Sequence, residues 1–454
     1  MTIETLADDL EAGRTTSRAL VDICLARIAD EAGEGARVFV RVDAQAARAQ
    51  ADAIDMLRAC GRAPGRLAGI PISLKDLLDV AGQVTTAGSM TLTDTLPAKT
   101  HAPVVARLLT AGMVPVGRTN MTEFAFSGMG LNPHFGTPAN PWDRTNRRIP
   151  GGSSSGAAVS VADGMAIVAI GTDTGGSCRV PAALCGVVGF KPTQRRVPLA
   201  GAWPLSPSLD SIGPIAQSVA DCAAVDAVLA GDIPAPLADV PLADVQLADV
   251  QLAGRRFVIP AGWADDLASE VETAFEAAVD RLRAAGAVVE ERAVKPFDAV
   301  DEANARGNLT VAEAWARHET RLERDGYRYD PFVRRRIERG ASMTAADLVR
   351  LTQARAKIIA DMEAEWAGMD ALLLPTCPIV APRIADLIDL DEAARVNARL
   401  LRGTSAINFV DGCSISLPCH APGTAPVGLM LSAGPMGDRR LLALALAVER
   451  LLGR

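Results

Sequence analysis

The stretch GTDTGGSCRVPA, residues 171–182, decides how this sequence is interpreted. It follows the apolar run MAIVAI and therefore predicts a buried strand that ends in a glycine-rich turn. Glycines in such a turn let successive backbone N–H groups point toward one place and stabilise negative charge there. Ser177 stands at the end of the turn. An oxyanion hole beside it could be formed by the amides of the three preceding residues, Thr174, Gly175 and Gly176.

A serine nucleophile needs a base, and the four histidines of the chain lie in no pattern that supplies one. A lysine can act as a base when burial keeps its amine neutral. Lys75 directly follows the apolar segment GIPISL, residues 69–74, which makes its burial plausible. The competing interpretation is a surface turn at Lys75 and Asp76.

Two other interpretations of the glycine loops stay open at this point. The segment GSSSG, residues 152–156, matches the GxSxG nucleophile elbow of α/β-hydrolases with Ser154 as nucleophile. An elbow requires an apolar strand before it, whereas DRTNRRIP precedes this one, and its histidine could only be His318 or His420. The loops could instead cradle an anion in a binding protein, although neither has a phosphate-loop or GxGxxG spacing.

Composition and element order predict an α/β protein. The chain has 454 residues, 49% of them hydrophobic, which suffices for a large core. Helical patterns alternate with short apolar strands, as in RRFVIP (255–260) and the helix DDLASEVETAFEAAVDRLRAAG (265–286). The remaining strand pattern DALLLPTCP and the last helix, RRLLALALAVERLL, close the chain.

Charge, cysteines and hydropathy exclude several classes of function. The formal charge of -8 is mild and its residues are interspersed, so we expect no direct nucleic-acid contact. The eight cysteines form no CxxC pair and the histidines no HExxH pattern, so we expect no metal and no cofactor. No apolar run reaches the ~18–20 residues of a membrane helix, and the N-terminus is acidic. We therefore expect a cytoplasmic protein without membrane contact.

The order of patterns predicts four segments. Residues 1–66 are expected to form an N-terminal helical segment packed on the core, and residues 67–235 the catalytic core. The five-residue repeat PLADVPLADVQLADVQLAG, residues 236–254, fits neither helix nor strand and is expected to be an extended connector. Residues 255–454 are expected to complete the core, with a helical cap.

Taken together, a series of blocks resembles the amidase signature family. These are GIPISLKD (69–76), TTAGS (85–89), ARLLTAGMVPVGRTNMTEFAFSG (106–128), LNPHFGTPANPW (131–142), GGSSSGAAV (151–159), GTDTGGSCRVPAALCGVVGFKPT (171–193) and SLDSIGPIAQSVAD (208–221). The resemblance continues more thinly at residues 370–378 and 408–431. It implies the fold of that family, a mixed twisted central sheet covered by helices on both faces.

The resemblance also implies roles for individual residues. The nucleophile would be Ser177, the bridging serine, in a cis peptide, would be Ser153, and the base would be Lys75. The same correspondence places the oxyanion hole at the backbone of residues 174–177. Further residues match supporting positions: Ser155, Thr172, Asp173 and Arg179, the last two as a structural pair. The loop of residues 124–132 would line the acyl side of the substrate through Phe126, Gly128 and Met129.

Members of that family act on a range of carbon–nitrogen bonds. The resemblance implies an amidohydrolase that cleaves a small amide or carbamate with water through an acyl-enzyme, with ester cleavage as a side activity and a homodimer as one candidate assembly. The family also includes the amidase subunit of a tRNA-dependent amidotransferase, which works with a partner; we keep this as the alternative and favour a stand-alone hydrolase. Residues 300–345, with Trp315, Tyr327, Tyr329 and an arginine cluster, could cap the cleft, although charged helical faces are usually solvated surface.

Overall fold

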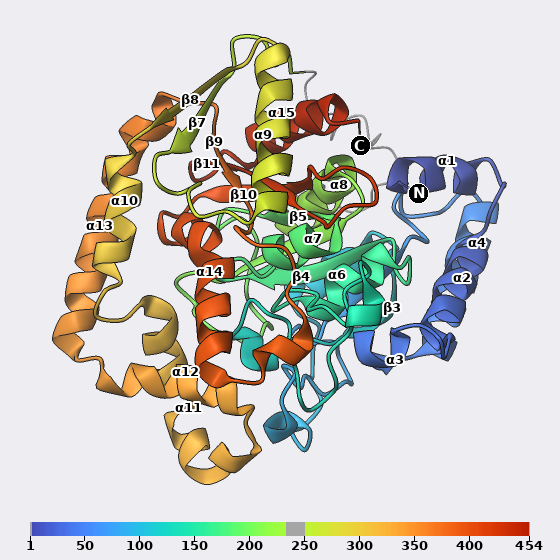
Figure 1. Cartoon of the computed structure of the whole chain (residues 1–454). Coiled ribbons are helices and arrows are strands. Elements are labelled where there is room, and N and C mark those ends of the chain that lie inside the picture. Colours follow the sequence, from blue (N-terminus) through green and yellow to red (C-terminus); the bar gives the residue numbers. More distant parts are fainter. Residues whose placement is uncertain (1, 233–249, 454) are drawn as a thin grey trace.

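The computed structural model describes residues 2–232 and 250–453. Most of the predicted connector, residues 236–249, therefore lies outside the described residues. The described residues form an 11-stranded sheet at the centre of the molecule (Figure 1). Its strands are β1 Phe39–Val42, β2 Pro71–Lys75, β3 Val114–Thr119, β4 Val168–Asp173, β5 Val188–Lys191, β6 Ser211–Ala216, β7 Arg256–Pro260, β8 Val288–Arg292, β9 Ala371–Pro375, β10 Cys413–Pro418 and β11 Gly428–Ala433.

Side-chain hydrogen bonds cap several of the helices at their first turn. Thr16 caps α2 by accepting from the amide of Ala19, and Asp43 caps α4 in the same way from Ala46. The described helices are α1 Ile3–Glu11, α2 Ser17–Ala29, α3 Gly35–Val38, α4 Ala44–Ala59, α5 Pro103–Thr110, α6 Ser155–Ala162, α7 Arg179–Cys185, α8 Val219–Ala230, α9 Ser269–Ala284, α10 Lys295–Ala303, α11 Leu309–Asp325, α12 Pro331–Glu338, α13 Ala345–Ala367, α14 Leu390–Phe409 and α15 Asp438–Leu451.

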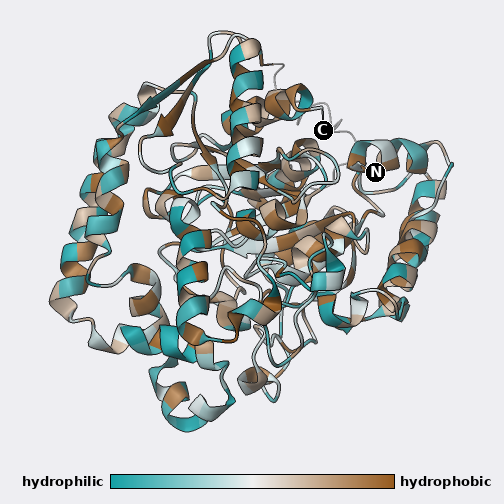
Figure 2. Cartoon of the chain, viewed as in Figure 1, coloured by the Kyte–Doolittle hydropathy of each residue, from teal (hydrophilic) through white to brown (hydrophobic). Residues whose placement is uncertain are grey.

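The sheet is mixed and covered on both faces, as predicted. Its strand order is β1-β3-β2-β4-β6-β5-β10-β11-β9-β7-β8. Strand β2 runs parallel to β3 and β4, whereas β4 is antiparallel to β6. Alternate residues of β4 enter different apolar clusters: Val168 and Ile170 pack with α5, α8 and α15, and Ala169 packs with α6 and α7. The apolar colouring of Figure 2 accordingly gathers on the central strands.

The segment before residue 67 departs in one respect from the helical segment that the sequence predicts. Besides α1 to α4 it contributes β1, an edge strand that pairs antiparallel with β3. Helix α1 buries Ile3, Leu6 and Leu10 in the large core cluster.

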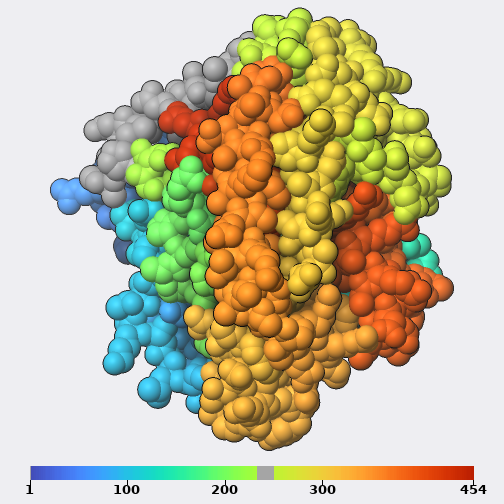
Figure 3. Space-filling model, turned by 90° about the vertical axis from the view of Figure 1, so that its left-hand side faces the viewer, coloured from blue at the N-terminus to red at the C-terminus, as the bar shows by residue number. Residues whose placement is uncertain are grey.

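Helices α10 to α13 form a layer at one side of the sheet. Helix α13 runs down this side with α10 beside it, and α11 and α12 lie beneath them (Figures 1 and 3). These helices come from the region that the sequence predicts as a cap. No helix within residues 2–232 and 250–453 is long and apolar enough to cross a membrane.

Three neighbouring parallel strands position the polar segments singled out from the sequence. Strands β3, β2 and β4 end at Thr119, Lys75 and Asp173, and parallel strands carry their carboxyl ends to the same edge. The loop before α6 is joined to this edge, because the amide of Thr122 donates to the carbonyl of Ser153 at 3.1 Å.

Candidate active site

Lys75 ends β2 and lies fully buried among hydroxyl groups. Its Nζ is 2.8 Å from Ser153 Oγ, 2.9 Å from Ser154 Oγ and 2.8 Å from Thr172 Oγ1. No carboxylate among the described residues forms an ion pair with it. Lys75 therefore does not lie in the surface turn that was the competing interpretation. Its amine is buried in a cage of uncharged hydroxyl groups.

The surroundings of Lys75 favour its neutral form. Burial lowers the pKa of its amine from 10.5 to about 7, against a smaller opposing effect of Cys178, Asp173 and Asp210. A neutral amine carries a lone pair that can accept a proton. Lys75 therefore has the burial and the pKa of a base that works near neutral pH.

Asp173 and Arg179 form the structural pair that was expected, and they hold the loop between β4 and α7. Arg179 Nη2 lies 2.9 Å from Asp173 Oδ1, and Nε lies 3.0 Å from Oδ2. Burial alone would raise the pKa of Asp173, but the charge and hydrogen bonds of Arg179 hold it below its usual range. Asn408, on α14, also donates to Asp173 Oδ1 at 3.0 Å. The carboxylate is therefore a charged anchor beneath the loop.

The Asp173 carboxylate accepts from two amides of the loop, those of Gly176 and Cys178, and leaves others available. The Gly176 N–H donates to Asp173 Oδ1 at 2.8 Å, so this amide of the predicted oxyanion hole is engaged. The amides of Gly175 and Ser177 have no acceptor among the described residues. Gly176 has φ of 139°, and a Cβ there would collide with Thr404.

Neighbouring elements fix the two residues at the start of the loop. Thr174 donates its hydroxyl to Asp210 Oδ1 at 2.5 Å, and Thr404 of α14 donates to the carbonyl of Gly175 at 2.7 Å. Burial raises the pKa of Asp210 to about 6. Because these contacts tie the loop to the segment before β6 and to α14, its free amides are held in a fixed orientation.

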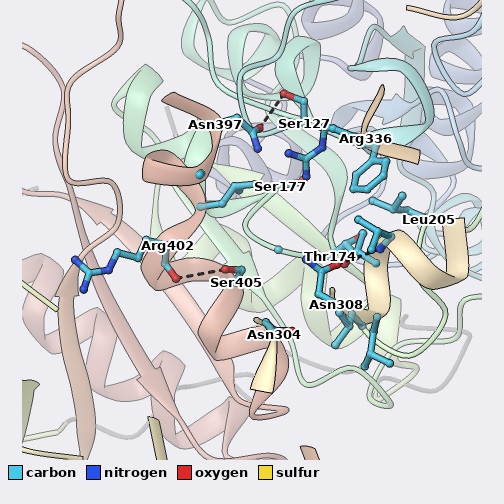
Figure 4. Close-up of a pocket in the computed structure, with 18 of the residues that line it drawn as sticks. Ser127, Thr174, Ser177, Leu205, Asn304, Asn308, Arg336, Asn397, Arg402 and Ser405 are labelled. Atoms are coloured by element: carbon cyan, nitrogen blue, oxygen red, sulfur yellow. Dashed lines mark hydrogen bonds between the residues drawn. The ribbon is translucent and has the colours of Figure 1, made fainter. Parts of the chain in front are cut away.

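Ser177 lines a cavity of about 700 Å³ between the sheet edge and the helical layer. Figure 4 shows Ser177 and Thr174 around this cavity with Asn304 and Asn308, from the turn between α10 and α11, and with residues of α12 and α14. The region predicted as a cap supplies Val300, Asn304, Asn308, Phe332 and Arg336, among others. Of the three named aromatic residues of that region none lines the cavity, and Tyr327 is 82% exposed.

The three residues predicted to line the acyl side lie in different environments. Phe126 lines the cavity. Gly128 does not; its amide donates to Asn397 Oδ1 at 2.8 Å and its carbonyl accepts from Gly152. Met129 is fully buried in an apolar cluster with Val180 and Leu184.

The serine loop has the cis peptide that the resemblance implied and hydroxyl contacts that the motif did not reveal. The peptide between Gly152 and Ser153 is cis. Ser154, rather than Ser155, contacts Lys75, and Ser155 Oγ has no hydrogen-bond partner in the described part of the chain. Ser154 also donates to the carbonyl of Thr172 at 3.2 Å. Consecutive hydroxyls give no sequence signal for which one turns toward Lys75.

The geometry does not favour Ser154 as an elbow nucleophile. Its side chain is fully buried and is not among the residues that line the cavity. His318, one of the two candidate bases for it, instead has Nδ1 at 2.9 Å from the hydroxyl of Tyr329. Burial lowers the pKa of His318 to about 3.

A family model described as Amidase matches residues 19–442 of the chain. The chain belongs to the amidase family. A solved structure described as a crystal structure of amidase superposes with a TM-score of 0.87 at 33% identity, covering 99% of both chains. The fold assignment is thus confirmed together with the family.

Two curated relatives span nearly the whole chain. The 2-amino-5-chloromuconic acid deaminase of Comamonas testosteroni is 36% identical over 453 residues, which cover 97% of this chain and 93% of the relative. A glutamyl-tRNA(Gln) amidotransferase subunit of Chloroflexus aurantiacus is 35% identical over 478 residues, which cover 99% and 96%. This amidase is accordingly a hydrolase of carbon–nitrogen bonds, as the sequence predicted.

Proposed function

We propose that the amidase hydrolyses a small amide or carbamate through an acyl-enzyme on Ser177, with Lys75 as base and Ser153 as the group between them. The observation that carries the proposal is the buried, uncharged cage of Lys75. Its amine has a pKa of about 7 and lies 2.8 Å from Ser153 Oγ. Burial lowers this pKa, and no described carboxylate forms an ion pair with the amine that would raise it again. The amine can therefore accept a proton near neutral pH.

The donors and acceptors around the Lys75 amine indicate in which direction the proton moves. Ser154 donates its hydroxyl hydrogen to the carbonyl of Thr172, so it accepts from Lys75. A neutral amine has two N–H donors and one lone pair. The relay assigns that lone pair to Ser153, which passes its proton to Lys75 while it takes the proton of Ser177. Ser177 Oγ then bonds to the substrate carbonyl carbon.

Charge that develops on the carbonyl oxygen would be stabilised by N–H groups already held in place. The amides of Gly175 and Ser177 have no other acceptor among the described residues, and Asp173, Asp210 and Thr404 fix their loop. The relay then returns the proton to the leaving nitrogen, and the carbon–nitrogen bond breaks. Water, deprotonated by the same groups, releases the acyl group as an acid and restores Ser177.

Turnover of simple amides by the purified chain tests this proposal. Ammonia or aniline release is measured from aliphatic amides, aryl amides and aryl carbamates for the wild type and for Ser177→Ala. We expect the variant to lose at least about 1000-fold in kcat/KM, since losing a covalent nucleophile leaves only binding and the oxyanion hole. Near wild-type turnover by Ser177→Ala would refute the assignment.

A second candidate function is that of an amidase subunit within a tRNA-dependent amidotransferase. It is favoured by the 35% identity to such a subunit over 99% of this chain. The two functions differ in whether the chain works alone. Hydrolysis of any amide, ester or carbamate by the isolated chain supports the stand-alone enzyme; the absence of all three activities supports the partner-dependent one.

A further inference from the structure

One partly buried cation in the cavity has neither an ion pair nor a hydrogen bond among the described residues. Arg336, on α12, enters the cavity that Ser177 lines (Figure 4). Its guanidinium carbon lies 4.5 Å from the ring centre of Phe126 and 5.8 Å from that of Phe332. Its Nε is shielded from solvent and has no hydrogen-bond partner, and no described carboxylate forms an ion pair with the side chain.

The other arginines around the cavity are occupied or lie in solvent. Arg335 pairs with Asp391 at 2.6 Å, and Arg399 pairs with Asp266 at 3.2 Å. Arg402 donates to the carbonyl of Gly262 at 3.1 Å. The remaining one, Arg339, is exposed at the rim. Within the described part of the chain, Arg336 is therefore the partly buried arginine of this cavity that has no ion pair and no hydrogen bond, with its Nε shielded from solvent.

The charge of the cavity as a whole is positive. Its lining contains five arginines and one acid, Asp301, which is exposed. Burial, and then Arg339, lower the pKa of Arg336 to about 10, so the guanidinium stays charged at neutral pH. A charged group shielded from water without a counter-ion is costly, and a bound anion would remove that cost.

A second donor is available beside Arg336. Asn397, on α14, uses its Oδ1 to accept from Ser127 Oγ at 3.1 Å and from the amide of Gly128 at 2.8 Å. Its acceptor is thus consumed, and what remains is its NH₂ group, a donor. Figure 4 shows Asn397 and Ser127 bonded next to Arg336. On this wall of the cavity, the groups of Arg336 and Asn397 that remain available to a ligand are all hydrogen-bond donors. They therefore favour a ligand that only accepts hydrogen bonds.

We propose that Arg336 binds a carboxylate of the substrate, so that the amidase acts on amides that also carry an acid group. This inference rests on the proposed function and names its substrate class. A single planar guanidinium matches one carboxylate, which it can bind through two parallel N–H···O bonds. The guanidinium lies against the rings of Phe126 and Phe332, and these contacts help to hold its plane.

Matched substrate pairs test the proposal. Succinamate is compared with butyramide, glutaramate with valeramide and, for an acid on the amine side, N-benzoylglycine with N-ethylbenzamide. Wild type, Arg336→Met and Arg334→Met are assayed with each pair. Arg334 lies on the same helix but outside the cavity, in an exposed pair with Glu338 at 2.6 Å, and serves as the control.

We expect the wild type to prefer the acid in at least one pair. Arg336→Met should then lose about 100-fold in kcat/KM for that acid, with the neutral partner changed less than about threefold. Arg334→Met should keep the preference. Equal rates for acid and neutral partner in every pair, or a preference that survives in Arg336→Met, would overturn the proposal.

Binding of glutarate separates this proposal from the proposed function. Calorimetry should detect glutarate on the wild type and on Ser177→Ala, and a loss of affinity of at least about tenfold in Arg336→Met. If no amide is hydrolysed and glutarate still binds in this way, the catalytic proposal fails and the carboxylate site stands. If amides are hydrolysed and glutarate binds Arg336→Met as well as the wild type, the carboxylate site is refuted.

Discussion

The titration of Lys75 gives a quantitative prediction for the pH dependence of catalysis. Its pKa is about 7 because burial lowers it. With this value, roughly one-tenth of the molecules hold a neutral amine at pH 6 and roughly nine-tenths at pH 8. Since the relay requires the neutral form, kcat/KM for an uncharged amide should rise about tenfold between these values and then level off. A lysine with the ordinary pKa of 10.5 would keep the activity rising to alkaline pH.

The assay is ammonia release from butyramide between pH 5.5 and 9.5, at constant ionic strength. Butyramide has no group that titrates in this range, so the profile reports the enzyme. Lys75→Met should lose at least about 1000-fold together with the rising limb. Lys191→Met provides a matched control, because Lys191 is another buried lysine but donates to the carbonyl of Pro192 at 2.8 Å, outside the cavity. A flat wild-type profile, or an unchanged limb in Lys75→Met, would refute the role of Lys75.

The hydroxyl cage and the loop anchor give three further predictions. Ser153→Ala should lower kcat/KM of an aryl amide by about 100-fold or more, and Ser154→Ala by less, because the proposed relay runs through Ser153 whereas the Ser154 hydroxyl donates to the carbonyl of Thr172; equal losses would contradict the relay. Asp173→Asn should lower the free energy of unfolding near neutral pH by about 3–5 kcal/mol in denaturant titrations, because it leaves Arg179 buried without its anion. The depressed pKa of Asp173 means that its contribution is present above the ordinary pKa of 3.8 and is lost as the pH falls below it, so the two proteins should converge in acid. For Lys75 the unfolded chain binds the extra proton between pH 7 and 10.5, so the free energy of unfolding of the wild type, relative to Lys75→Met, should increase with pH across this window.

Much of the site was predictable because its residues end strands and fill short glycine-rich turns. The apolar run before Lys75 predicts its burial, and the alternation of strands and helices predicts the α/β sheet whose parallel strands bring β2 and β4 together. The family blocks supplied Ser153 and the pairing of Asp173 with Arg179. These features are local, or lie in segments with a dense pattern.

The remaining features depend on contacts between distant segments. Asn397 meets Ser127 across 270 positions of the sequence, and no local pattern marks it. The unpaired state of Arg336 is visible only when the partners of the neighbouring arginines are known. The orientation of Ser154 toward Lys75 depends on backbone geometry at residues 152–155, which a run of serines does not specify. Side-chain pairing across the cavity therefore had to come from the structure.

The acyl-enzyme on Ser177 is tested most directly by trapping it. The wild type is mixed with a slowly deacylating O-aryl carbamate, which loses its phenol when the carbamoyl group is transferred, then quenched in acid during turnover and digested. The modified serine is located by tandem mass spectrometry, because Ser153, Ser154 and Ser177 lie between the same two arginines, Arg148 and Arg179. We predict one added carbamoyl group on the peptide that contains Ser177, absent from Ser177→Ala and strongly reduced in Lys75→Met. An unmodified Ser177 during turnover, or a carbamoyl group on Ser153 or Ser154, would contradict the central claim.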